Sequence, residues 1–136
     1  MDTLKAWVLD VGNCSPDHSS IRNMLEKNFD VSVDQVMFVD EAIARMQARK
    51  YDLVLVNRLI FDDGSEGIDL LRVAKADPAV AATPIMMLSN YEEAQAAAIA
   101  AGAERGFGKA AIGQSDVIGL LGRYLPRKGA AATTVR

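Results

Sequence analysis

The feature that most constrains this chain is a short apolar run in its middle, from Leu53 to Val56. Asp52 precedes the run and Asn57 closes it. A run this short, apolar on both alternating faces, is typical of a strand that is buried on both sides in the middle of a parallel sheet. Ligands and reactive groups collect at the carboxyl ends of the strands in such sheets. Because Asn57 stands at that end, the function of the chain depends largely on it.

Segments of strand and helix character alternate through the rest of the chain. We expect strands at residues 5–10, 31–38, 51–57, 84–89 and 105–109. We expect helices at residues 15–28, 40–49, 68–77, 92–101 and 115–125. The expected N-caps of three of these helices are Ser15, Asp40 and Ser115. Five alternating units predict an α/β fold, a doubly wound five-stranded parallel sheet with helices on both faces.

Length and composition indicate one compact domain. With 136 residues, 50% of them hydrophobic, we expect a single domain at residues 1–126 and a frayed polar tail at 127–136. A net charge of -3 and a pI near 5.1 argue against a nucleic-acid-binding surface. No apolar run approaches the ~20 residues of a membrane span, and the opening residues do not form a secretion signal. The single Cys14 allows no internal disulfide, so the cytoplasm is the expected compartment.

Three polar residues fall at the carboxyl ends of expected strands. They are Asp10, Asn57 and Ser89, and Lys109 closes the fifth strand. Because the carboxyl ends of parallel strands share one edge of the sheet, these four side chains can converge on one crevice.

At these positions the chain resembles the CheY-like receiver domain of two-component response regulators, over residues 4–126. The resemblance rests on the segments 51–57 and 84–89, and on Ala101-Gly102-Ala103 followed by Lys109. It implies the same flavodoxin-like sheet. It also implies that family members accept a phosphoryl group on an Asp at the position of Asn57 and bind Mg²⁺ through an acidic pair at the end of the first strand. A hydroxyl at the position of Ser89 and the Lys at that of Lys109 would hold the phosphoryl oxygens.

The chain departs from this pattern where the chemistry occurs. Asn57 is a neutral carboxamide and a poor nucleophile for a step that a carboxylate performs. The acidic pair is reduced to Asp10, beside Val11, and Asp10 corresponds to either the first or the second family acid. One carboxylate thus replaces three. Because Mg²⁺ needs carboxylates or phosphates to offset its dehydration, we expect neither Mg²⁺ nor another cofactor.

Two further departures concern conformational switching. Family members often carry a mobile aromatic residue in the fifth strand, and that position is Gly106 here, with Phe107 on the opposite face. The family Lys is usually followed by a cis proline, but Ala110 follows Lys109. A cis bond costs ~2.5–4 kcal/mol before a residue other than proline, so we expect a trans bond that re-aims Lys109.

Structural roles are the simplest interpretation of the individual site residues. We expect Asn57 to bond its own turn and Asp10 to pair with Lys109. Ser89 is equally suited to capping the alanine-rich helix. His18 is expected to be exposed, because the chain has no second His with which to share a metal.

The loop from Val11 to Ser15 offers a second kind of site. Cys14 precedes a helix, a position that can activate a thiol, and the Gly and Ser content permits the loop to cradle a phosphate or a flavin. Nothing in the sequence demands such a ligand.

These observations lead to one main hypothesis and two alternatives. We expect a stand-alone receiver-like signalling module that is not an enzyme and has lost phosphoryl transfer. It would bind a kinase, an output protein or another receiver, or form a homodimer, through the Glu92–Leu125 face. One alternative is a functional receiver that uses Asp62 or Asp63 of a lengthened loop as its phosphoacceptor. The other is a small-molecule binder, for a nucleotide or flavin, at the strand-end crevice.

Overall fold

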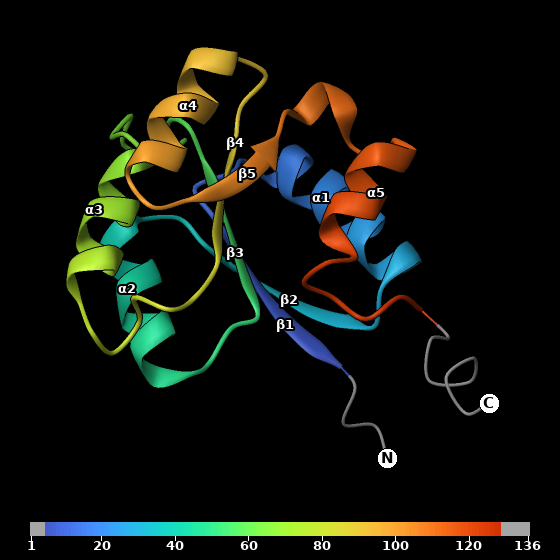
Figure 1. Ribbon diagram of the computed structural model, residues 1–136, viewed down its shortest axis with the longest axis horizontal. Coiled ribbons are helices and arrows are strands. Elements are labelled where there is room, and N and C mark those ends of the chain that lie inside the picture. The colour runs from blue at the N-terminus through green and yellow to red at the C-terminus, as the bar shows by residue number, and fades with distance from the viewer. Residues whose placement is uncertain (1–4, 129–136) are drawn as a thin grey trace.

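The computed structural model describes residues 5–128 and contains a five-stranded parallel sheet between two layers of helices (Figure 1). The strand order across the sheet is β2-β1-β3-β4-β5. The strands are β1 (Ala6–Val11), β2 (Val31–Val36), β3 (Leu53–Asn57), β4 (Ile85–Leu88) and β5 (Glu104–Phe107). The helices are α1 (Ser15–Asn28), α2 (Val39–Ala48), α3 (Ile68–Ala76), α4 (Glu92–Ala100), a 3₁₀ turn η1 (Lys109–Ala111) and α5 (Ser115–Leu121).

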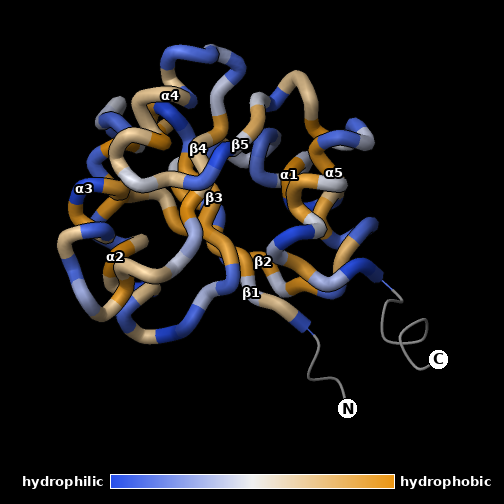
Figure 2. The backbone as a smooth tube through the Cα atoms, viewed as in Figure 1, coloured by the Kyte–Doolittle hydropathy of each residue, from blue (hydrophilic) through white to orange (hydrophobic). Residues whose placement is uncertain are grey.

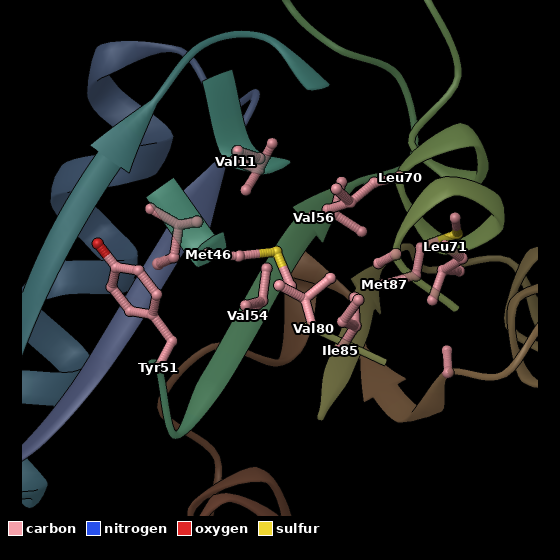
Figure 3. Close-up of a cluster of buried hydrophobic side chains, with 14 of the residues drawn as sticks. Val11, Met46, Tyr51, Val54, Val56, Leu70, Leu71, Val80, Ile85 and Met87 are labelled. Carbon is pink, nitrogen blue, oxygen red and sulfur yellow. The ribbon is translucent and has the colours of Figure 1, made fainter. Parts of the chain in front are cut away.

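The core lies on both faces of the sheet. Figure 2 shows the most hydrophobic stretches of the chain along the strands in the middle of the molecule. One cluster joins the sheet to α2, α3 and α4, and Figure 3 shows part of it, with Met46, Val54 and Leu71 among its members. The other cluster joins the opposite face to α1 and α5, through residues such as Leu25, Leu55 and Leu121. Both layers of helices are therefore held by apolar burial, the dominant favourable contribution to folding.

The central position of β3 confirms the expectation from its apolar run. It pairs in parallel with β1 on one side and β4 on the other, and its residues 53–56 are wholly buried. The α/β fold with a doubly wound five-stranded parallel sheet is likewise confirmed.

The expected helix caps were each misplaced by one or two residues. The observed N-cap residues of α1, α2 and α5 are Cys14, Phe38 and Gln114, and none makes a side-chain cap of its own. In α2 the capping hydrogen bond instead joins the backbone of the N-cap residue to a side chain of the first turn. The Phe38 N–H donates to the Glu41 carboxylate at 3.1 Å. A glutamate in the first turn can therefore replace an N-cap side chain and move the helix start.

The chain stays attached to the fold beyond residue 126, which corrects the expected start of the tail. Arg127 forms an antiparallel bridge with Phe29, and the Lys128 N–H donates to the Asn28 carbonyl. The remainder of the expected tail, residues 129–136, lies outside the described residues. Within residues 5–128, no helix combines the length and apolarity needed to cross a membrane.

Candidate functional site

Asn57 ends β3 with its amide group pointing into its own turn. Its Nδ2 donates to the Leu59 carbonyl at 2.6 Å and approaches the Gly12 carbonyl at 3.4 Å. The bond to its own turn is the one expected from the sequence. Two backbone oxygens thus face an N–H₂ group at the carboxyl end of β3. The amide hydrogens supply the positive partial charge that these oxygens require.

The register of β1 against β3 places Gly12, rather than Asp10, level with Asn57. Asp10 pairs with Leu55 and Val11 with Val56, so the next residue along each strand brings Gly12 beside Asn57. Gly12 has a φ of +80°, and an added Cβ would lie 2.4 Å from the Ile60 side chain. Because L side chains rarely adopt this φ, an acid at this level of β1 would strain the backbone.

Asp10 lies below that level and is fully buried. Its Oδ1 accepts a hydrogen bond from Asn13 Nδ2, and its Oδ2 lies 2.6 Å from His18 Nδ1. Burial raises the pKa of the Asp10 carboxyl, while the bonds from His18 and Asn13 oppose that rise. The expected pairing of Asp10 with Lys109 is wrong, and so is the expected exposure of His18. Both carboxylate oxygens are already engaged by neighbours from the following loop and helix.

Lys109 turns away from Asp10 and binds a different carboxylate. Its Nζ donates to Asp17 Oδ2 at 2.7 Å, and this bond holds the pKa of the Asp17 carboxyl below its usual range. The peptide bond to Ala110 is trans, as expected, and Lys109 begins the turn η1. The interpretation of Lys109 as an ion-pair partner is therefore right, with Asp17 as the partner.

Ser89 and Lys109 line a small hollow at the carboxyl ends of β3 and β4. The volume of the hollow is about 190 Å³, and Asn57 forms part of its wall. Ser89 Oγ accepts the Tyr91 N–H at 3.1 Å, just before α4 begins. Three of the four predicted site residues thus converge on one hollow, while Asp10 is engaged beneath it.

Gln95 joins the backbones of β4 and β5 through its side chain, a role that was not predicted from the sequence. The pairing of β4 with β5 shifts between Met86–Glu104 and Leu88–Phe107, which leaves an extra residue in β5. The buried Gln95 side chain bridges the gap. Its Nε2 donates to the Met87 and Ser89 carbonyls at 2.9 and 3.2 Å, and its Oε1 accepts the Gly106 N–H at 3.0 Å. A side chain of α4 thereby satisfies backbone groups that the irregular ladder leaves unpaired.

Gly106 is required by the same irregularity. A Cβ at this position would lie 2.2 Å from the Met87 carbonyl oxygen, so any side chain would displace the backbone of β4. Phe107 is buried among residues of α1 and α5, on the face of the sheet opposite α4. This agrees with the expectation that Phe107 faces away from the side of position 106. An aromatic residue therefore cannot occupy position 106 in this arrangement of β4 and β5.

The loop between β3 and α3 folds back on itself. Leu59 and Glu66 form an antiparallel bridge, and the Ile60 N–H donates to the Ser65 carbonyl at 2.8 Å. Asp63 accepts bonds from the backbone and hydroxyl of Ser65, which lower the pKa of its carboxyl. Asp63 lines a different hollow, beside the start of α2, together with other acidic residues, Asp40, Glu41 and Asp69. Neither Asp62 nor Asp63 belongs to the lining of the hollow that contains Ser89 and Lys109.

The loop from Val11 to Ser15 is packed rather than open. The Gly12 carbonyl is approached by Asn57 Nδ2 and also accepts the Phe61 N–H, and Asn13 is fully buried. Cys14 is partly buried. Asn13 Oδ1 has no hydrogen-bond partner among the described residues. The Gly12 carbonyl and the Asn13 side chain of the loop therefore hold Asn57 and Asp10.

Comparison with known proteins shows the fold. No family model and no curated protein matches the sequence. A proposed response regulator from Chloroflexus aurantiacus J-10-fl superposes with a TM-score of 0.76 and 20% identity, over 87% of this chain and 96% of that one. The phosphorylated cyanobacterial phytochrome response regulator RcpA gives 0.71 and 20%, over 88% and 94% of the two chains. The receiver domain of a signal transduction histidine kinase from Syntrophus aciditrophicus gives 0.68 and 18%, over 96% and 93%. The chain therefore has the fold of CheY-like receiver domains.

The residues that sequence reasoning missed are polar side chains at inward-facing positions. Gln95 and Ala98 are the buried residues of α4, three positions apart on one face of the helix. A glutamine on the inward stripe of an alanine-rich helix was the available signal, because a buried amide requires partners. Asn13 gave no such signal, since its burial depends on the turn at Gly12.

Proposed function

We propose that this chain is a receiver-like signal-transduction module of the two-component type that is not phosphorylated and acts by protein–protein interaction. The observation that carries the proposal is the amide of Asn57, which donates into its own turn at the phosphoacceptor position. The likeness to receiver domains supports the signalling role. A carboxamide does not attack a phosphoryl group as a carboxylate does.

The proposal includes the absence of a Mg²⁺ requirement. Mg²⁺ prefers octahedral coordination by oxygen, with one or two carboxylates. Within residues 5–128, no three acidic, His or Cys side chains come together to hold a metal. Asp10 has both oxygens engaged, and Asn57 presents amide hydrogens to the Leu59 and Gly12 carbonyls. The residues present do not fit Mg²⁺.

Phosphorylation at Asp62 or Asp63 is the less favoured function. Phosphoryl transfer relies on positioned cations and hydrogen-bond donors around the phosphoryl oxygens. Ser89 and Lys109 line one hollow, and Asp63 lines another together with three further acids. Negative neighbours oppose the arrival of a phosphoryl donor at Asp63, and Asp62 does not line the hollow that contains Ser89 and Lys109.

Protein partners are proposed in two forms, a signalling protein such as a kinase, an output protein or another receiver, or a second copy of this chain. The Glu92–Leu125 face was the surface expected from the sequence. On it, Arg105 and Glu92 form an ion pair, and the outer surface of α4 is mostly small alanines with one larger apolar residue, Ile99. Such a surface allows close approach of a partner but offers it few anchoring side chains.

We expect the chain to show no mass increase of one phosphoryl group after incubation with acetyl phosphate and Mg²⁺. The reason is that position 57 carries an amide and that the residues around it do not fit Mg²⁺. Intact mass spectrometry makes the measurement, with an ordinary receiver under the same conditions as the positive control. A labelled adduct that maps to Asp62 or Asp63 would contradict the proposal and support the functional-receiver alternative.

We also expect a single conformation of the segment from Ser89 to Glu92. Coupling between two sites requires an element with two alternative states. Here Gln95 ties the Ser89 carbonyl to Gly106, and position 106 carries no side chain that could move. Relaxation-dispersion NMR should detect no joint microsecond–millisecond exchange at Ser89 and Phe107. Correlated exchange at these two residues would show that a switch survives.

A further inference from the structure

The hollow at the carboxyl ends of β3 and β4 is lined by basic side chains and, among the described residues, by no acidic one. Its lining includes two cations, Arg58 and Lys109, and no acidic residue. The other lining residues are Asn57, Leu59, Leu88, Ser89, Asn90 and Tyr91. The chain as a whole has a net charge of -3, whereas this hollow is lined by positive and neutral side chains, of which Lys109 is already paired with Asp17 and Arg58 has no such partner among residues 5–128. Such a lining favours a negatively charged group.

Several side chains that line this hollow keep hydrogen atoms that can donate to a ligand. Ser89 uses its oxygen to accept the Tyr91 N–H, which leaves its own hydroxyl hydrogen free to donate. Asn90 uses its Oδ1 to accept the Ala110 N–H, which leaves its amide hydrogens. The Arg58 guanidinium lies 5.4 Å from the centre of the Tyr91 ring and makes no ion pair with a carboxylate among residues 5–128. A carboxylate in the hollow could therefore receive bonds from an arginine, a hydroxyl and an amide.

Exposed apolar side chains lie in the loops that form this hollow, and two of them, Leu59 and Tyr91, line it. Leu59, Phe61 and Tyr91 are 42%, 63% and 58% exposed. They are three of the five large apolar side chains exposed among residues 5–128, and all three lie in the loops that follow β3 and β4. The other two, Val73 and Ile99, lie singly on α3 and α4. Aromatic residues and arginine, gathered at one place, are the residue types that dominate binding energy at protein interfaces.

We propose that these residues form a docking surface for a protein segment in which an aspartate or glutamate stands next to an apolar residue. The carboxylate enters the hollow beside Arg58 and Ser89, and the apolar side chain packs on Tyr91 and Leu59. The inference rests on the proposed function, because it names the partner chemistry of a module that acts by protein binding. Charge complementarity selects the carboxylate, and the exposed apolar side chains select a polypeptide over a small anion.

A displayed library of random short peptides tests this surface on the full chain. Peptides selected on the wild-type protein should combine an acidic residue with a neighbouring leucine, isoleucine or phenylalanine. Fluorescence anisotropy of the best labelled peptide should then show at least a tenfold loss of affinity for Arg58→Glu and for Tyr91→Ala. Changing the acidic residue of the peptide to its amide should cause a similar loss.

Arg123→Glu provides a matched control. It makes the same change of charge at an exposed arginine, in a cleft at the amino ends of β3 and β4 that is also lined by Asp52 and Pro84. Its affinity for the peptide should equal that of the wild type. Thermal unfolding of each variant should match the wild type, so that a loss of binding is not a loss of folding.

Other outcomes would overturn the inference. Selected peptides that lack an acidic residue, or that bind Arg58→Glu as well as wild type, would remove the basis for the carboxylate. Self-association lost in Tyr91→Ala would assign the surface to a second copy of the chain. Peptides that contact the Glu92–Leu125 face would overturn the docking surface and leave the proposed function intact. A phosphoryl adduct in the separate mass measurement would instead overturn the proposed function.

Discussion

We expect the Gln95→Met variant to lose about 3 kcal/mol of its free energy of unfolding. Methionine has a similar length and no amide, so it fills the space while the Gly106 N–H and the Met87 and Ser89 carbonyls lose their partner. A buried group left without a hydrogen bond costs about 1–3 kcal/mol, and carbonyls tolerate this better than N–H groups. Most of the expected loss of stability therefore comes from the Gly106 N–H, which would be left without a hydrogen bond. Urea denaturation of both proteins measures the difference.

Gln47→Met serves as the matched control for this prediction. Gln47 lies on the exposed face of α2 and donates one bond to Asp77. Its replacement should change the free energy of unfolding by no more than about 0.5 kcal/mol. Hydrogen exchange at the Gly106 amide gives a second readout, because only the loss of the Gln95 bond exposes that group to exchange. Equal destabilisation by both variants, with Gly106 still protected, would show that Gln95 contributes only packing.

The fold could be predicted because burial follows simple periodicities. The run from Leu53 to Val56 is apolar at every position, and that alone placed β3 in the middle of a parallel sheet. The order of segments then left few topologies, since parallel strands need a helix between them. Helix ends were less predictable, because Glu41 can supply the hydrogen bond that an N-cap side chain would otherwise provide.

The site was predictable as a location but not as a set of contacts. Asn57, Ser89 and Lys109 do meet at one hollow, because strand ends must share an edge. The partner of Asp10 was not predictable, since it depends on the turn at Gly12, which brings Asn13 and His18 onto the carboxylate. The geometry of a single loop is hard to predict from residue patterns, whereas burial is predicted well by hydrophobic periodicity.

The irregular pairing of β4 with β5 is the clearest case of a feature hidden from the sequence. From the sequence, Gly106 is recognisable only as a position that lacks an aromatic side chain. The structure gives the physical reason, a backbone carbonyl 2.2 Å from where its Cβ would stand. Neither the extra residue of β5 nor the role of Gln95 follows from periodicity, because both depend on how two strands align in space.

The role of Val11 also changes the design of any attempt to restore phosphorylation. In the sequence, Val11 stands beside Asp10, where the resemblance implies a pair of acids. Val11 is fully buried in the cluster that joins the sheet to α2 and α3 (Figure 3). As the neighbour of Asp10 in β1, it faces the opposite side of the sheet. A carboxylate there would be buried without a partner, which is strongly destabilising. Adding Val11→Asp to Asn57→Asp should therefore impair folding rather than rescue function.

Asn57→Asp alone should not produce a working receiver, and it should destabilise the fold by about 1–2 kcal/mol. The new carboxylate has only acceptors, and it would face the Leu59 and Gly12 carbonyls that now receive the amide hydrogens. Gly12 brings no second acid level with it, and Lys109 is held by Asp17. Phosphoryl transfer depends on metal-ion charge neutralisation and positioning, which one new carboxylate does not supply by itself. Intact mass after acetyl phosphate and Mg²⁺, together with urea denaturation, gives the two measurements.

Asn57→Ala separates the causes of the expected destabilisation. It removes the same donor without adding a charge, so Asn57→Asp should be the less stable of the two at neutral pH. The gap between them should shrink in acid, where a protonated carboxyl group at position 57 can again donate to the Leu59 carbonyl. Asn57→Asp that is as stable as wild type and takes up a phosphoryl group as readily as an ordinary receiver would confine the loss to one residue. The surroundings of Asn57 argue for the opposite result, because its neighbours in β1 and in the turn after β3 are arranged around a hydrogen-bond donor.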